Sequence, residues 1–172
     1  MEQLRFLIDD FRRSTRGIPS RWFSAPFSQG FIVVAWYRLN RAGWLAFGRT
    51  WSALRVALSP AVALLRPWLG DEIDYRADIG PGMLILHPNL GVVVNGESLI
   101  GARLTLVGGN CIGGRGVRAG DNLTLGANAT VIGPISLGDG VLVAAGGVAV
   151  RDFAGPGELR GVPARPTLGQ EC

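Results

Sequence analysis

The amino-acid sequence predicts a mainly β protein, a parallel β-helix that follows a short N-terminal α-helical segment. Three observations predict it: glycine becomes abundant after residue 70, the aliphatic residues beyond that point recur every six positions, and the apolar residues before it recur at helical spacing. Residues 1–70 hold five glycines, whereas residues 71–172 hold 21. We therefore expect a helical segment over residues 1–70, a β-helix over residues 71–166 and a C-terminal tail over residues 167–172.

The helical segment differs from the rest of the chain in charge. It holds ten arginines and three acidic residues, whereas residues 71–172 hold seven arginines and ten acidic residues. A basic segment with several tryptophans is typical of peripheral contact with a membrane surface, and plain helix packing is the alternative interpretation. Its uncharged runs are too short to span a bilayer, and no nucleic-acid-binding motif is present, so no nucleic-acid partner is expected.

The cysteines and the N-terminal residues indicate the cellular compartment. Cys111 and Cys172 are too few for a disulfide scaffold and match no metal-binding spacing, and Cys111 is expected to fill the coil. Acidic residues interrupt the first ten positions, which is not the pattern of a signal peptide. We therefore expect a cytoplasmic protein, with any membrane contact at the inner face of the membrane.

The six-residue period is regular in the C-terminal half of the chain. One aliphatic series comprises Ala119, Leu125, Val131, Leu137, Val143 and Ala149, and a second series, offset by two positions, comprises Leu123, Ala129, Ile135 and Val141. Repeats of one short strand and a glycine- or asparagine-rich turn indicate a parallel β-helix, in which three repeats form one triangular coil. We expect the aliphatic side chains to point inward and to stack from coil to coil.

The period is broken twice, and the first break contains His87, the only histidine. Three extra residues separate Ile85 from Val94, and one extra residue lies between Ile112 and Ala119. The backbone must leave the coil at such a break, and departures from a rigid scaffold commonly carry function. Because imidazole can accept a proton from an alcohol near neutral pH, His87 is a candidate general base; a surface histidine beside a turn proline is the alternative.

Three strings carry a family resemblance: EIDYRADIGPGMLILHPNLGVVVN, GDNLTLGANATVIGPISLGDGVLVAAGGVAVRD and RGVPAR, in this order. Over about residues 71–166 the chain resembles the hexapeptide-repeat acyltransferases of the serine acetyltransferase type. Residues 20–70 also resemble the colanic-acid-type acetyltransferases of polysaccharide assembly. The resemblance implies a left-handed coil, an O-acetyltransferase that uses acetyl-CoA as co-substrate without a metal, and a homotrimer.

The resemblance also implies catalytic residues. Glu72 stands fifteen positions before His87, where the family places the acidic partner of its histidine, and Asp74 is the reserve partner. His87 would take the proton from an acceptor hydroxyl as its oxygen attacks the thioester of acetyl-CoA. The carboxylate would hold the imidazole tautomer and stabilise the imidazolium.

Further site residues follow from the same resemblance. Those expected at the coenzyme A groove are Gly108, Gly109, Ala127, Ala145, Gly161, Pro163 and Arg165. Among them, Gly108 and Gly109 would offer N–H groups to the thioester oxyanion, and Arg165 or Arg160 would meet a phosphate. Asn89 and Asn95 are expected to contact the acceptor.

Two departures from the serine acetyltransferases bear on the acceptor. The segment GGNCIGGRGVRAG is short and lacks their second histidine, and Asn95-Gly96 stands in place of their Gly-Glu pair. We therefore expect acetyl transfer to a sugar hydroxyl in polysaccharide biosynthesis, with serine O-acetylation in cysteine biosynthesis as the alternative. A non-catalytic membrane-associated scaffold is a third hypothesis, whereas a zinc-dependent carbonic anhydrase of this coil type would need three histidines.

Overall fold

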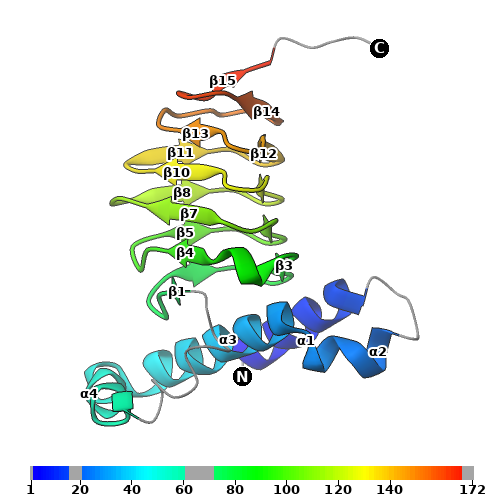
Figure 1. Ribbon diagram of the computed structural model, residues 1–172. Helices are drawn as coiled ribbons and strands as arrows, with labels where there is room; N and C mark the ends of the chain where they lie inside the picture. Colours follow the sequence, from blue (N-terminus) through cyan, green and yellow to red (C-terminus); the bar gives the residue numbers. More distant parts are fainter. Residues whose placement is uncertain (1, 16–20, 61–71, 168–172) are drawn as a thin grey trace.

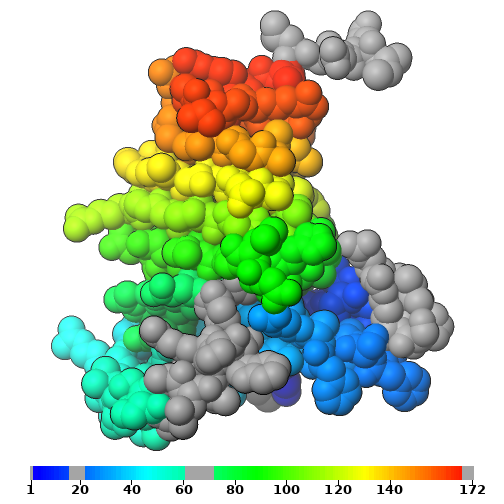
Figure 2. All heavy atoms as spheres, viewed as in Figure 1, coloured from blue at the N-terminus to red at the C-terminus, as the bar shows by residue number. Residues whose placement is uncertain are grey.

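The computed structural model describes residues 2–15, 21–60 and 72–167. It shows a triangular parallel β-helix standing on a layer of helices (Figure 1). Space-filling atoms show the coils stacked in sequence order above the helical base (Figure 2). The predicted boundary at residue 70 lies outside the described residues, as does all of the predicted tail after its first residue.

Three sheets of mainly parallel strands form the faces of the prism. The first face consists of β1 (Glu72–Ile73), β4 (Val92–Val94), β7 (Asn110–Gly113), β10 (Thr130–Ile132) and β13 (Val148–Ala149). The second face consists of β2 (Asp78–Ile79), β5 (Leu99–Ile100), β8 (Val117–Ala119) and β11 (Ile135–Leu137). The third face consists of β3 (Leu84–Ile85), β6 (Thr105–Leu106), β9 (Thr124–Leu125), β12 (Val141–Val143), β14 (Gly157–Arg160) and the antiparallel β15 (Arg165–Pro166).

The inward positions predicted from the period form the core. Both aliphatic series are buried, except that Ala119 is partly exposed. On the third face Ile85, Leu106 and Leu125 follow one another in register on successive coils. Burying each such side chain contributes roughly 1.5–3 kcal/mol, so the stacked column, and not any single coil, stabilises the prism.

Strand β7 corrects one expectation about the core. Successive side chains of a strand point to opposite sides, and in β7 the buried residues are Asn110 and Ile112. Cys111 therefore faces outward and is partly exposed. The prediction that Cys111 fills the coil is wrong, and the polar side chain of Asn110 lies inside instead.

The first break in the period is an excursion of the backbone, as predicted. After β3 the chain forms the 3-10 turn η3 (Pro88–Leu90) and then begins β4. The His87 amide donates to the Val107 carbonyl at 2.9 Å, and the His87 carbonyl accepts the Leu90 amide at 3.2 Å. The backbone on both sides of the His87 side chain is thus anchored.

The helical layer consists of α1 (Glu2–Thr15), α2 (Arg21–Ser24), the 3-10 helix η1 (Ala25–Phe27), α3 (Gln29–Phe47) and α4 (Arg49–Ala57). Helix α3 begins after Ser28, whose hydroxyl oxygen accepts the Phe31 amide. Helices α1 and α3 lie side by side beneath the first coil (Figure 1). None of the described helices is long and apolar enough to cross a membrane.

A buried ion pair joins the layer to the first coil. Arg38 Nε donates to Asp10 Oδ2 at 2.8 Å, and these side chains are 1% and 0% exposed. Arg38 also donates to the Ile79 and Gly80 carbonyls at 2.6 Å, and Asp10 accepts the Met83 amide at 2.7 Å. Burial raises the pKa of the Asp10 carboxyl, against the lowering effect of Arg38. Removing one partner would leave a buried unpaired charge, at a cost of about 3–5 kcal/mol, so the pair holds the layer in place.

Candidate functional site

His87 lies at an edge of the prism, in the turn that leads from the third face to the first. It directly precedes η3, with φ −127° and ψ 73°. Its side chain is exposed and makes no hydrogen bond with any residue in the described part of the chain. An exposed imidazole on an anchored backbone can receive a proton from a bound hydroxyl.

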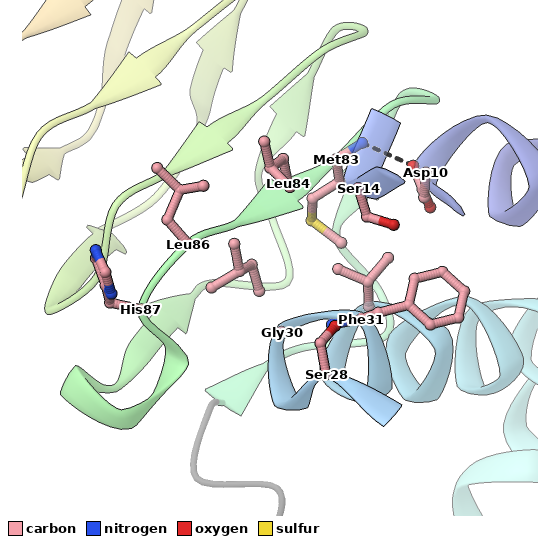
Figure 3. Close-up of a pocket in the computed structure, with 11 residues that line it drawn as sticks. Asp10, Ser14, Ser28, Gly30, Phe31, Met83, Leu84, Leu86 and His87 are labelled. Atoms are coloured by element: carbon pink, nitrogen blue, oxygen red, sulfur yellow. Dashed lines mark hydrogen bonds between the residues drawn. The ribbon is translucent and has the colours of Figure 1, made fainter. Parts of the chain in front are cut away.

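A cavity of about 400 Å³ adjoins His87, between β3 and the helical layer. Figure 3 shows His87 at one end of the strand that lines it and Asp10 toward the other end. Two hydroxyls of the lining, on Ser14 and Ser28, already donate to helix carbonyls, and Asp10 is engaged by Arg38. The rest of the lining is mostly apolar and consists of Gly30, Phe31, Val34, Met83, Leu84, Ile85 and Leu86.

Most of the predicted cofactor residues lie on the same edge as His87. This edge, called the His87 edge below, consists of the turns 86–91, 107–109, 126–128, 144–147 and 161–164. Backbone hydrogen bonds run along it: the Asn128 amide donates to the Gly108 carbonyl and the Gly146 amide to the Ala127 carbonyl, both at 2.8 Å. Neighbouring strands lie about 4.8 Å apart, so the five turns span about 19 Å. The residues brought together here are Gly108, Gly109, Ala127, Ala145, Gly161 and Pro163.

The two predicted carboxylate partners lie at different edges. Glu72 begins β1 and pairs with Val93 in β4, so it lies where the first face starts, at the His87 edge. The Glu72 side chain is exposed and makes no ion pair or hydrogen bond with a described residue, His87 included. Asp74 follows β1 and lies at the next edge, against Gly96.

Asp74 is also committed to another partner. Its carboxylate accepts hydrogen bonds from Arg76 Nη2 at 2.7 Å and from the Arg76 amide at 2.9 Å. Partial burial raises the pKa of Asp74, but the bonds from Arg76 outweigh it and hold this pKa below its ordinary value. Of the two carboxylates, only Glu72 is both on the His87 edge and without a competing cation among the described residues.

The N–H groups expected to form an oxyanion hole are already used. The Gly108 amide donates to Asn110 Oδ1 at 2.9 Å, and the Gly109 amide donates to the Gly91 carbonyl at 2.7 Å. An oxyanion hole needs donors aimed at the reacting oxygen, so this geometry gives the predicted oxyanion role no support. Gly108 instead packs against the catalytic candidate, because a Cβ on it would lie 2.5 Å from the His87 carbonyl oxygen.

The remaining predicted residues are spread over the molecule. Asn89 is exposed in η3, two residues after His87. Asn95 lies one face away, after β4, where its Oδ1 accepts the Glu97 amide at 2.8 Å. Within a single subunit Asn95 therefore does not lie next to His87. Arg160 is paired with Glu158 at 2.6 Å, whereas the exposed Arg165 makes no side-chain bond to a described residue.

Asn110 is a site residue that sequence reasoning missed. It is 2% exposed; its Oδ1 holds Gly108, and its Nδ2 donates to the carbonyls of Gly126 and Ala129 at 2.7 and 3.3 Å. It occupies the inward slot two positions before Ile112, which the buried Val92 and Ala129 occupy in the neighbouring coils. A polar residue in this otherwise aliphatic slot was the available signal.

No described group of three or more His, Cys, Asp or Glu side chains could hold a metal ion. The residues that the structure does place together are His87, with its exposed imidazole, and the turns of the elongated His87 edge. This arrangement can serve an acyl transfer in which His87 activates a hydroxyl.

Comparisons with known proteins agree on one family. The sequence is 36% identical over 160 residues to a serine acetyltransferase of Helicobacter pylori, which covers 89% of this chain and 90% of the relative. It is 33% identical over 144 residues to serine acetyltransferase 4 of Arabidopsis thaliana, which covers 80% of this chain and 39% of the relative. A structure of soybean serine acetyltransferase complexed with serine matches 96% of this chain and 70% of its own, with a TM-score of 0.80 and 25% identity.

The match to solved structures extends over nearly the whole chain, whereas the chain spans only part of some of its relatives. The structural match confirms the predicted fold class, a left-handed parallel β-helix with a short N-terminal helical segment. The chain spans less than half the length of the plant and cyanobacterial relatives that it matches. No protein-family model matches the sequence.

The expected sugar acceptor was wrong, and closeness to the colanic-acid-type enzymes has no support. Serine acetyltransferases of a plant, a cyanobacterium and Helicobacter pylori, and a solved soybean serine acetyltransferase, match this chain, which favours the alternative considered above. The departures that favoured a sugar concern two short stretches, whereas the likeness to the Helicobacter pylori protein extends over 160 residues. This chain belongs to the serine acetyltransferase family of hexapeptide-repeat acyltransferases.

Proposed function

We propose that this chain is an acetyl-CoA-dependent serine O-acetyltransferase with His87 as its general base. The observation that carries the proposal is the exposed imidazole of His87 on an anchored break in the β-helix, in a chain of this family. The relatives are serine acetyltransferases, and we take the acceptor, serine, and the acetyl group from them. We further propose that the reaction takes place in the cytoplasm, the compartment that the cysteine usage favours.

Acetyl transfer at His87 is direct and needs no covalent enzyme intermediate. His87 removes the proton of the serine hydroxyl as the hydroxyl oxygen attacks the thioester carbonyl carbon of acetyl-CoA. The C–S bond then breaks, and the imidazolium returns its proton to the departing thiolate. General-base assistance of this kind contributes about 10²–10⁴ in rate. Glu72 would orient the imidazole and stabilise its charged form.

The His87 edge fits an elongated donor. Its length of about 19 Å suits an extended pantetheine arm lying across the turns, with the thioester at His87. The exposed Ala145, Gly161 and Pro163 leave room along the edge. Arg165, at the far end, would meet a phosphate of the nucleotide.

We also propose that the chain works as a homotrimer whose first faces lie at the interface. The outward side chains of β4, β7, β10 and β13 are uncharged, and Val93 and Ile132 are 44% and 43% exposed. This face borders the His87 edge, so a neighbouring subunit would complete the acceptor site. Asp10, the carboxylate that lines the cavity in the described part of the chain, is already paired with Arg38. A charged group that binds the acceptor would therefore have to come from the neighbouring subunit. Residues 71–166 would form the catalytic unit of each subunit and residues 1–70 its helical segment.

The test is a thiol-release assay with the full chain, acetyl-CoA and L-serine. Release of one CoA thiol per O-acetylserine formed is the expected result, and His87→Gln should lower kcat by about 10²–10⁴ while leaving the thermal midpoint unchanged. His87→Gln keeps the polarity of the exposed side chain but cannot take up the proton. Absence of turnover with L-serine would overturn the acceptor, and undiminished turnover by His87→Gln would overturn the mechanism.

A further inference from the structure

We propose that the cavity beside His87 holds the hydrocarbon tail of an acyl group longer than acetyl, so that the protein also accepts medium-chain acyl-CoA thioesters as donors. This cavity of about 400 Å³ lies between β3 and the helical layer, and His87 is part of its lining. The assignment rests on the proposed function, which places the thioester at His87. It widens the range of donors and leaves L-serine as the acceptor.

The cavity lies on the opposite side of His87 from the turns assigned to the coenzyme. Turns 107–109, 126–128 and 144–147 of the His87 edge belong to successive coils leading away from the helical layer. The cavity instead lies between the helical layer and β3, the strand at the lower end of the third face. The carbonyl carbon of a thioester carries its sulfur and its acyl tail on different sides. With the sulfur directed along the turns, the tail points toward the helical layer and enters the cavity.

The cavity is much larger than an acetyl group needs. A methyl group occupies about the volume of a water molecule, roughly 30 Å³, whereas the cavity measures about 400 Å³. Its lining follows β3 from His87 back to Met83, four residue steps or about 13 Å. An octanoyl tail, with carbon–carbon bonds of about 1.5 Å, extends about 9 Å. A tail of this length therefore fits along the strand between His87 and Asp10 (Figure 3).

The lining suits methylene groups. Its apolar residues include Phe31 from α3 and Leu84 and Leu86 from β3. Leu86 directly precedes His87 and is 37% exposed, so apolar surface is available where a tail would leave the thioester. Covering this surface with hydrocarbon removes apolar area from water and favours binding in proportion to that area.

The same lining argues against serine as the occupant. Free serine carries an ammonium and a carboxylate group, and each needs a partner when it leaves water. Among the described lining residues, the Asp10 carboxylate is already paired with Arg38 at 2.8 Å. The hydroxyls of Ser14 and Ser28 already donate to helix carbonyls. An uncharged hydrocarbon tail needs no such partner, so the acyl group fits the cavity better than the acceptor does.

The experiment is a calorimetric titration of the full chain with acetyl-, butyryl-, hexanoyl- and octanoyl-CoA, without L-serine. We expect the Kd to fall about fourfold for each added methylene, the factor that corresponds to burial of one such group. A Kd that stays constant or rises with the length of the tail would overturn the proposal. Because no acceptor is present, this measurement does not depend on the acceptor's identity.

Leu84→Asn tests the location of the tail, since it keeps the size of the side chain and removes its apolar character. It should reduce the preference for octanoyl-CoA over acetyl-CoA about tenfold. The matched control is Leu142→Asn, because Leu142 is 37% exposed and occupies the same outward column of the third face, far from the cavity. Leu142→Asn should keep the preference of the unmodified chain. An equal loss in both variants, or a loss in neither, would overturn the assignment.

Addition of L-serine separates this inference from the proposed function. We expect one thiol to be released per O-octanoylserine formed, with kcat/KM at least equal to that for acetyl-CoA. Binding that strengthens with tail length, without transfer of any acyl group to L-serine, would overturn the acceptor and support the cavity assignment. Transfer of acetyl alone, with octanoyl-CoA bound but unreactive, would overturn the donor range.

Discussion

The buried side chain of Asn110 holds the amide of Gly108, at 2.9 Å, in the coil directly above His87. Gly108 in turn lies against His87, whose own amide donates to Val107. A line of contacts thus runs from the interior of the prism to the catalytic candidate. We infer that Asn110 is a positioning residue for His87.

Asn110→Asp should damage both stability and turnover. The exchange replaces the Nδ2 donor by an oxygen that faces the carbonyls of Gly126 and Ala129. Both carbonyls keep a backbone amide donor, but losing two buried hydrogen bonds at about 0.5–1.5 kcal/mol each costs about 1–3 kcal/mol, measurable by urea unfolding. Under conditions where the variant is folded, kcat should fall while KM for acetyl-CoA stays near its original value. Asn122→Asp, an exposed turn residue that accepts from Arg103, is the control and should change neither; a loss of stability with unaltered kcat would refute the positioning role.

Gly108→Ala should displace His87. The new methyl group would lie 2.5 Å from the His87 carbonyl oxygen and 3.2 Å from its Cβ, at a φ of 141°. A misplacement of about 1 Å at a catalytic base can cost about 100-fold in rate, so we expect kcat to fall by that order. Gly48→Ala is the matched control, because it has φ 54° and its methyl group would meet nothing within 4 Å. Gly48→Ala should therefore cost stability through backbone strain alone, and equal kcat in the two variants would contradict the contact argument.

Glu72→Gln and Asp74→Asn should separate catalysis from stability. Glu72 lies on the His87 edge, so its exchange should lower kcat about tenfold or more without moving the thermal midpoint. Asp74 is held by Arg76, which lowers the pKa of the Asp74 carboxyl below its ordinary value of 3.8. The ionised carboxylate therefore stabilises the fold above pH 3.8, and this stabilisation is lost as the pH falls through the pKa of the folded state. Asp74→Asn should thus be less stable than the unmodified chain at pH 7 and equal to it well below pH 3.8, with kcat retained. The opposite assignment of effects would make Asp74 the partner of His87.

The six-residue period was enough to predict the column, because an inward aliphatic side chain every six positions is a direct consequence of the coil geometry. Leu125 and Val143 lie where the period puts them. Strand parity was also available in the sequence, and applying it to Asn110 and Cys111 would have avoided the error over Cys111. Neither inference needs knowledge of contacts between distant segments.

Contacts between distant segments account for what could not be predicted. The pairing of Asp10 with Arg38, and of both with the first coil, depends on how the helical layer docks. No local pattern signals that a charged residue in an apolar helix points inward. The acceptor was misjudged for a different reason: single positions such as Asn95 were read as specificity residues, yet Asn95 lies one face away from His87 and bonds to its own turn.

Tyr37 should make the stability of the chain fall at alkaline pH. Its side chain is 2% exposed and its hydroxyl donates to the Ala77 carbonyl at 2.9 Å. Burial raises the pKa of Tyr37 from 10.0 to about 12, although the nearby Arg38 and Arg41 lower it in part. Because the raised value favours the neutral form in the folded state, the stabilisation is complete below pH 10 and is lost between about pH 10 and 12.

Tyr37→Phe removes this titration together with one hydrogen bond. At pH 6 and pH 8 the variant should be less stable by a constant amount of about 0.5–1.5 kcal/mol, the usual worth of one hydrogen bond. By pH 12 the unmodified chain should have lost about 2 kcal/mol that the variant does not lose, so the order of stability should reverse. Denaturant unfolding of both proteins at each pH measures the difference directly. A difference that stays constant up to pH 12 would mean that the Tyr37 hydroxyl is not shielded from water at the junction of α3 and the first coil.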